Sequence, residues 1–237
     1  MVPENLLPLA AEGTQPEYNF APYVSSVARS PRQQLVLLPC SLIDRTGPVF
    51  GRSLLKPNDN DLTVHHAAEP IGERIFVHGR VLDEDGKPVR NTLVEMWQAN
   101  ACGRYRHKVD TYRAPLDPNF SGGGRTITDE NGYYWFKTIK PGPYPWGNHY
   151  NAWRPSHIHF SLFGSGLLSR LVTQMYFPGD PLLPLDPIFN SIADPRARNR
   201  LISSLDMHRA EPDNALAYAF DIVLRGSNDT PFEDRHR

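Results

Sequence analysis

Proline constrains the fold of this chain more than any other residue type. The 237 residues include 23 prolines and 17 glycines. Both are spread along the sequence, whereas a disordered tract would concentrate them. Proline fixes the backbone angle φ and removes a backbone hydrogen-bond donor. Prolines scattered among aromatic-rich segments therefore predict many ordered loops that join short strands.

From Gly72 onward, short apolar segments alternate with turns. The segments are ERIFVHGRVLD, TLVEMWQAN, GYYWFKTI, SHIHFSLF, LVTQMYF and AYAFDIVLRG. Connections such as DEDGK and DENG are rich in Asp, Asn and Gly, which are typical of turns between strands. The pattern predicts an all-β fold, namely an antiparallel β-sandwich with long Pro-rich loops.

The first 70 residues show little periodicity and contain many prolines and asparagines. They predict an extended N-terminal arm, residues 1–70, that packs on the core and on a partner subunit. The β-sandwich domain then covers residues 71–237. Within the arm, the apolar run Leu35–Leu38 fits either a strand or a continuation of the arm.

One short helix is expected in the C-terminal half, between Asp194 and Leu205. Asp194 suits the N-cap and Pro195 suits the first helical position. One face of this helix would carry the apolar side chains of Ala197, Leu201, Ile202 and Leu205.

Composition excludes several classes of partner. The formal net charge is −1, so the chain lacks the basic surface that binds nucleic acid. No segment approaches the roughly 20 apolar residues of a membrane helix, and the N-terminal segment lacks the pattern of a signal peptide. Two cysteines, Cys40 and Cys102, form no metal-binding motif. A cytoplasmic protein with free thiols is the expectation.

The segment WRPSHIHF contains the sharpest local signal for chemistry. Side chains two positions apart lie on one face of a strand, so His157 and His159 project together while Ile158 and Phe160 point to the core. Such an H-x-H pair can present two imidazoles to one metal ion. Two solvated histidines at the edge of a core would give the same pattern.

Two tyrosines accompany the histidines. Tyr144 stands between Pro143 and Pro145, and both prolines restrict the backbone around it. Tyr105, in GRYRHK, follows the segment that ends in WQAN. Taken alone, Tyr144 is better explained by aromatic packing under a Pro-rich loop, and Tyr105 fits a basic, aromatic segment of a surface loop.

The motifs together resemble a known family. WQANACGRYRHK, APLDPNF, GYYWFKTIKPGPYPW, WRPSHIHF and QMYFPGDPL are similar to segments of the β chains of protocatechuate 3,4-dioxygenases, which are intradiol ring-cleavage dioxygenases. The resemblance runs from about Tyr23 to Arg225. It implies a β-sandwich with one non-haem iron(III) per chain, bound by Tyr105, Tyr144, His157 and His159.

The resemblance also implies roles for the neighbouring residues. The iron would open the ring of protocatechuate with O2 and give 3-carboxy-cis,cis-muconate, while Tyr144 leaves the metal as the substrate chelates it. Arg154 would stabilise negative charge on the substrate ring. Substrate-binding residues would be Tyr23, Trp146, Gln174 and Ile188, supported by Trp97 and Tyr176. The partner would be an α subunit of the same enzyme, in a larger assembly of αβ units.

Three alternatives remain at this point. The enzyme could act on catechol or hydroxyquinol, although those relatives carry a helical N-terminal domain and this chain has a Pro-rich arm. An extradiol site would need a carboxylate beside the two histidines, and the sequence shows none at a convincing place. A transthyretin-like binding module would share GRVLDEDGKPVRNTLVEMWQA but would need no set of two tyrosines and two histidines.

Overall fold

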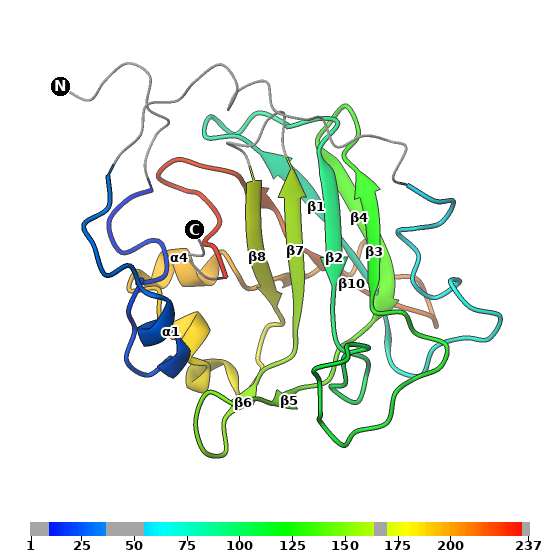
Figure 1. The fold of residues 1–237 in the computed structure, drawn as a ribbon. Helices are drawn as coiled ribbons and strands as arrows, with labels where there is room; N and C mark the ends of the chain where they lie inside the picture. The colour runs from blue at the N-terminus through cyan, green and yellow to red at the C-terminus, as the bar shows by residue number, and fades with distance from the viewer. Residues whose placement is uncertain (1–9, 37–54, 164–169, 234–237) are drawn as a thin grey trace.

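The computed structural model describes residues 10–36, 55–163 and 170–233. Two β-sheets pack face to face, with short helices gathered beside strand β8 at one edge (Figure 1). The predicted β-sandwich is therefore confirmed. Cys40 and the second half of the run Leu35–Leu38 lie outside the described residues.

One sheet has four strands in the order β3, β2, β7, β8, and all its pairs are antiparallel. Its strands are β2 (Leu93–Trp97), β3 (Gly123–Ile127), β7 (His157–Phe163) and β8 (Arg170–Tyr176). The strand β3 has the sequence GGRTI, and its glycines hide it from a search for apolar segments. In this sheet β7 pairs with β8 along its whole length and with β2 from His159 to Phe163.

The second sheet is mixed, which corrects the expectation of purely antiparallel strands. Its strands are β1 (Arg74–Leu82), β4 (Tyr133–Ile139), β9 (Ser204–Leu205), β10 (Leu216–Ala219) and β11 (Ile222–Val223). Strand β4 pairs antiparallel with β1, whereas β10 and β11 pair parallel with it. The segment AYAFDIVLRG, expected as one strand, is divided between β10 and β11.

The main core fills the space between the two sheets. Ile158, Phe160 and Leu162 of β7 are fully buried there, as the alternation along SHIHFSLF predicts. The opposite sheet contributes side chains such as Val77 of β1 and Phe136 of β4. Face-to-face packing of two such apolar surfaces is the main source of stability in a sandwich.

The helices differ from the single one expected. Within the described residues they are α1 (Val24–Arg29), the 3-10 turn η3 (Leu183–Leu185), α3 (Pro187–Asn190) and α4 (Pro195–Asn199). Helix α4 begins as predicted, because the Asp194 side chain accepts a hydrogen bond from the Arg196 N–H. It ends at Asn199 and not near Leu205, which lies instead in strand β9 and is half exposed. A second apolar cluster packs α3 and α4 against Tyr176 of β8.

The N-terminal segment contacts the sandwich at several points. Pro16 forms a β-bridge with Ile192, and the Asp194 N–H donates to the Gly13 carbonyl over 2.9 Å. Farther along, the Asn148 side chain donates to the Pro22 carbonyl over 3.0 Å. The residues between 10 and 29 therefore follow the edge of the fold where the helices lie (Figure 1).

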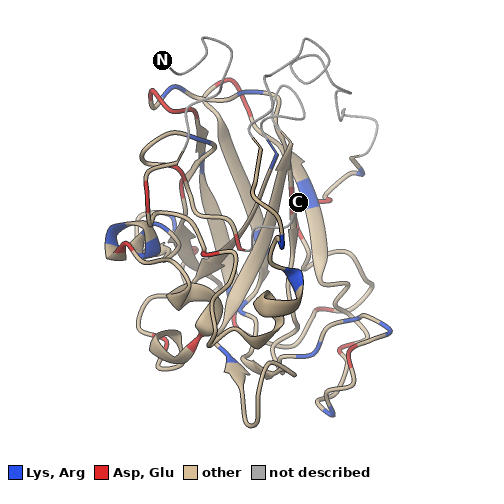
Figure 2. Ribbon diagram, turned by 60° about the vertical axis from the view of Figure 1, so that its left-hand side comes forward, with Lys and Arg blue, Asp and Glu red and all other residues tan. Residues whose placement is uncertain are grey.

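The remaining strands are β5 (Tyr144–Pro145) and β6 (Trp153–Arg154), which form a small hairpin at one end of the sandwich (Figure 1). Figure 2 shows acidic and basic residues interspersed around the fold, in keeping with the net charge of −1. Among the described residues, no helix is long and apolar enough to cross a membrane.

Gly79 of β1 allows the chain between β10 and β11 to pass close to this strand. A Cβ at this position in β1 would lie 1.9 Å from the carbonyl oxygen of Phe220, where the chain passes from β10 to β11. We expect Gly79→Ala to reduce the free energy of unfolding by about 1–3 kcal/mol, measured by urea denaturation, because the backbone must move. Gly147→Ala is the control, since a Cβ there would meet no atom within 4 Å. Equal stability of the two variants would contradict this account.

Candidate metal centre

Strand β7 places the two histidines side by side. His157 is paired with Tyr176 of β8, and His159 is paired with Gln174 of β8 and Trp97 of β2. Their ring centroids are 4.8 Å apart, on the face of the sheet opposite to Ile158 and Phe160. His157 is fully buried, and His159 is largely buried.

Tyr144 reaches the histidines from the β5–β6 hairpin. Its hydroxyl oxygen lies 3.3 Å from Nε2 of His157. Tyr144 is paired with Arg154 across the hairpin, so the same small element positions both residues. Proline on each side of Tyr144 limits its backbone, as the sequence predicted.

Tyr105 comes from the loop that follows β2. Its hydroxyl oxygen lies 3.1 Å from Nε2 of His159, and its backbone N–H donates to Asp110 over 2.8 Å. Gly103 holds this loop against the Tyr144 segment: its φ is +77°, and a Cβ there would lie 2.1 Å from the Pro143 carbonyl oxygen. The two tyrosine rings meet edge to face at 5.3 Å.

Two phenol oxygens and two imidazole nitrogens therefore converge. Burial raises the pKa of Tyr105 well above its usual value, and the neighbouring Tyr144 raises it further. Burial also lowers the pKa of His157 well below its usual value, helped by the charge of Arg154 and by His159. His157 is thus neutral, which is the form that binds metals. Buried phenols ionise most readily beside a cation, so this donor set fits a hard, highly charged metal ion.

The Nδ1 atoms of the two histidines have different hydrogen-bond partners. Nδ1 of His157 lies 2.7 Å from the Pro155 carbonyl oxygen. Nδ1 of His159 lies 2.6 Å from the Glu233 carboxylate, and the His159 ring stacks on Trp97 at 4.8 Å and 5°. Burial raises the pKa of Glu233, but the hydrogen bonds from His159 and Gln174 and the nearby charge of Arg154 together outweigh burial and leave the pKa lowered.

Glu233 corrects the expectation that no acidic residue lies beside the H-x-H pair. The correction does not create a site of two histidines and one carboxylate, because Glu233 bonds the nitrogen of His159 that faces away from Tyr105. Over the described ranges, no group of three or more His, Cys, Asp or Glu side chains is placed to hold a metal ion. The extradiol alternative lacks its third ligand in this geometry.

A buried ion pair lies behind the histidines. Arg154 is 2% exposed, and its guanidinium donates to Asp186 over 3.1 and 3.0 Å. It also donates to Gln174 Oε1 and to the Tyr176 hydroxyl. Burial opposes the charge of Arg154, but the Asp186 carboxylate, together with Tyr176 and Tyr144, outweighs burial and raises the Arg154 pKa well above its usual value. Arg154 is therefore held charged by the protein itself.

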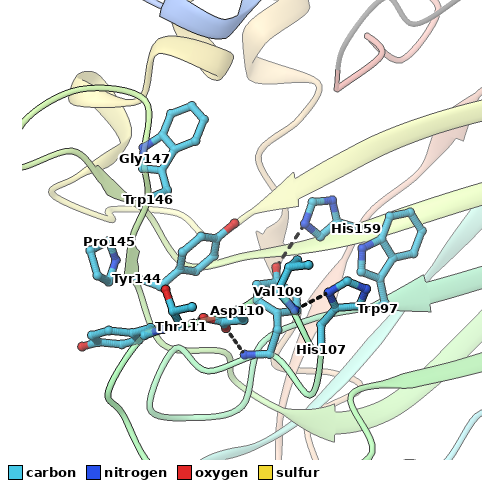
Figure 3. A pocket seen from close by; sticks show the side chains of 12 residues that line it. Trp97, His107, Val109, Asp110, Thr111, Tyr144, Pro145, Trp146, Gly147 and His159 are labelled. Atoms are coloured by element: carbon cyan, nitrogen blue, oxygen red, sulfur yellow. Dashed lines mark hydrogen bonds between the residues drawn. The ribbon is translucent and has the colours of Figure 1, made fainter.

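A cavity of about 580 Å³ opens in front of the donor set, which is within the range of small-molecule sites. Figure 3 shows Trp97 beside His159 at one side and Trp146 at the other. The Tyr105–Tyr112 loop forms much of the rest of the lining, through Tyr105, His107, Val109, Asp110, Thr111 and Tyr112.

Comparison with known proteins agrees with this geometry. The family model described as "Dioxygenase" matches residues 45–226, and one described as the N-terminal part of the protocatechuate 3,4-dioxygenase β subunit matches residues 10–41. A protocatechuate 3,4-dioxygenase β chain from Burkholderia cepacia is 60% identical over 222 residues, which is 93% of this chain and 94% of the relative. This chain belongs to the intradiol ring-cleavage dioxygenases.

Other members of the family are more distant. The protocatechuate 3,4-dioxygenase α chain of Pseudomonas putida is 36% identical over 69% of this chain and 77% of the relative. Among solved structures, the dioxygenase domain of a carbohydrate-binding fusion protein from Streptomyces sp. SirexAA-E matches with a TM-score of 0.51 and 27% identity, over 76% of this chain and 95% of that one. The structure of catechol 1,2-dioxygenase from Acinetobacter sp. ADP1 matches with a TM-score of 0.53 and 27% identity, over 70% of this chain and 56% of that one.

Of the other predicted site residues of this dioxygenase, some line the cavity and others lie outside its lining. Trp146 lines the cavity, and Tyr23 packs on the Trp146 ring at 5.4 Å. Ile188 is buried at the start of α3, where its N–H donates to Asp186. Ile188 and Gln174 are not among the described residues that line the cavity. His107 is exposed on the cavity wall.

Asp186→Asn should destabilise this enzyme strongly. It would leave the charge of Arg154 buried without its carboxylate, and breaking a buried pair in this way costs about 3–5 kcal/mol. The measurement is the free energy of unfolding in urea, compared with Asp85→Asn, which breaks the exposed Lys87–Asp85 pair. That control should change the free energy by about 0–1 kcal/mol. A similar small effect for both variants would show that Asp186 is not essential to the fold.

Proposed function

We propose that this chain is the iron-bearing β subunit of a protocatechuate 3,4-dioxygenase. The observation that carries the proposal is the convergence of Tyr105, Tyr144, His157 and His159, linked by phenol-to-imidazole distances of 3.1 and 3.3 Å. The 60% identity to a β chain of that name, over nearly the full length of both chains, supports the substrate. The chain spans little more than half of the catechol 1,2-dioxygenase structure, which makes that type a poorer fit.

The four donors would hold one iron(III). Phenolate oxygens suit this hard cation better than thiolates, and two phenolates offset most of its charge. The chemistry supplied by a bound ferric ion is withdrawal of electron density from a chelated catecholate, which makes a ring carbon reactive toward O2. Both imidazoles would present Nε2 to the metal, since Nδ1 of each is already hydrogen-bonded.

The protein's residues would accept a proton from the substrate and stabilise its negative charge. A catechol that binds as a dianion must lose two protons. Tyr144 Oη is the proposed acceptor of one of them, and a hydroxide held with the iron would accept the other. Tyr105 would remain bound, held by its backbone contact to Asp110. Arg154 would add positive potential from behind the site, where burial strengthens its effect on negative charge in the substrate.

The cavity would orient the substrate ring. Trp146 and Pro145 line the same cavity as Trp97 and His159, so a flat aromatic ring fits between apolar surfaces. Tyr23, which packs on Trp146, is the proposed contact for the substrate carboxylate. Gln174 and Ile188 would act from behind the cavity, where Gln174 bonds Arg154 and Ile188 bonds Asp186.

An α subunit is the proposed partner. Its support is the name of the 60% identical relative, a β chain, together with the similarity to an α chain. The apolar groups Val24 and Val27 of α1 are more than half exposed and lie on the segment that carries Tyr23. We propose that the N-terminal arm and the α subunit complete the substrate site together.

The proposed reaction is tested by spectroscopy and product analysis. The enzyme, purified with its partner chain, should show a visible tyrosinate-to-iron(III) band that shifts when protocatechuate is added without O2. Admission of ¹⁸O2 should give 3-carboxy-cis,cis-muconate that contains both oxygen atoms. A colourless protein with stoichiometric metal, or a product cleaved outside the two hydroxylated carbons, would overturn the proposal. Faster turnover of catechol or hydroxyquinol would reassign the substrate.

Tyr144→Phe should change the band and slow ring cleavage by about 100-fold, because it removes a ligand and a proton acceptor. The control is Tyr150→Phe in the adjacent turn, where the native side chain is 97% exposed. Iron content, absorption spectrum and kcat are measured for both variants and compared. A Tyr144→Phe enzyme with the spectrum and kcat of the control would remove Tyr144 from the site.

A further inference from the structure

We propose that Glu233 positions His159 in the metal centre, so that the segment after strand β11 is a working part of the site. The inference rests on the proposed function, because it concerns the histidine that would bind iron. It adds a residue that lies 74 positions from His159 in the chain and outside every motif near the donors.

The hydrogen bond fixes the tautomer of His159. An ionised carboxylate can only accept hydrogen bonds, so the proton of a neutral His159 must be on Nδ1, which lies 2.6 Å from Glu233 Oε2. Nε2 then carries a lone pair, and it is the nitrogen that faces the Tyr105 hydroxyl at 3.1 Å. Glu233 therefore selects the form of His159 that can bind a metal.

Glu233 also fixes the orientation of the ring. The His159 imidazole is stacked on Trp97 with an interplanar angle of 5°, which leaves rotation within the stacking plane as its main freedom. The short bond to Glu233 removes that freedom because it anchors one edge of the ring. His157 has a neutral backbone carbonyl in the same role, so of the two histidines it is His159 whose Nδ1 faces a carboxylate.

The carboxylate itself is held in place. Gln174 Nε2 donates to Glu233 over 3.1 Å, while Gln174 Oε1 accepts from Arg154 and from Tyr176. These partners set the direction of the Gln174 amide, because its oxygen must face the two donors. A continuous set of hydrogen bonds thus runs from buried Asp186 through Arg154 and Gln174 to Glu233 and His159.

The backbone around Glu233 is anchored independently of the metal centre. The Glu233 N–H donates to the Val172 carbonyl of β8 over 3.0 Å, and the Thr173 hydroxyl donates to the Pro231 carbonyl over 2.6 Å. The Phe232 N–H donates to Gln15 over 2.9 Å. Strand β8 and the N-terminal arm therefore direct the carboxylate to His159.

The test compares two variants of Glu233 in the enzyme purified with its partner chain. Glu233→Ala removes the acceptor and the charge, whereas Glu233→Gln keeps an acceptor oxygen without charge. We expect iron loss to a chelator to become roughly 10–100-fold faster in Glu233→Ala, with a smaller increase in Glu233→Gln. The tyrosinate-to-iron band should shift in the same order, since His159 becomes a weaker and less ordered donor.

A control separates positioning from a general loss of negative charge. Glu130→Gln removes an acidic charge from an exposed ion pair with Arg90. This variant should keep the native band and the native rate of iron loss. Iron loss in Glu130→Gln as fast as in Glu233→Ala would overturn the proposal, because loss of negative charge alone would explain the effect.

The result also separates this inference from the proposed function. A native enzyme without a tyrosinate-to-iron band would refute the iron site, and the role of Glu233 with it. A native enzyme with the band, together with Glu233 variants that match it in spectrum and iron retention, would refute only the role of Glu233.

Discussion

The pairing of strand β7 between β2 and β8 is the constraint on which both the core and the site depend. Because side chains alternate across a strand, one register places Ile158 and Phe160 in the core and His157 and His159 on the opposite face. A shift by one residue would exchange the two sets. The free energy of core burial therefore also sets the position of the proposed metal-binding nitrogens.

The buried ion pair of Arg154 and Asp186 connects the site to the edge of the molecule where the helices lie. Asp186 is also the N-cap of α3, where its side chain accepts from the Ile188 N–H. Arg154 belongs to the hairpin that presents Tyr144. One carboxylate therefore joins a helix start, a hairpin and the hydrogen bonds behind the histidines. Such an arrangement explains how a short hairpin and a four-residue helix can have fixed positions beside the site.

Local patterns predicted most of the fold, whereas the four proposed metal ligands followed from the resemblance to a known family. The strand alternation of SHIHFSLF and the cap of α4 both depend on neighbouring residues, so the sequence displays them directly. The parallel pairing of β10 with β1 was not predictable in this way, because no local feature of LAYA specifies its partner. Leu205 was misplaced for a similar reason: its place in a helix or in β9 depends on contacts with Tyr218. Glu233 stands in a segment with no recognisable motif, and only the folded path brings it to His159.

The order in which the chain is synthesised gives the contact between Glu233 and His159 a further meaning. A ribosome has completed Tyr105, Tyr144, His157 and His159 long before it adds Glu233, 74 residues after His159. Domains begin to fold during synthesis, starting from the N-terminal side. A nascent chain would therefore contain all four proposed metal donors before it contains Glu233, the carboxylate proposed to orient His159. If iron binds there as proposed, an ion captured during translation would meet a looser set of ligands than an ion that arrives after the chain is released.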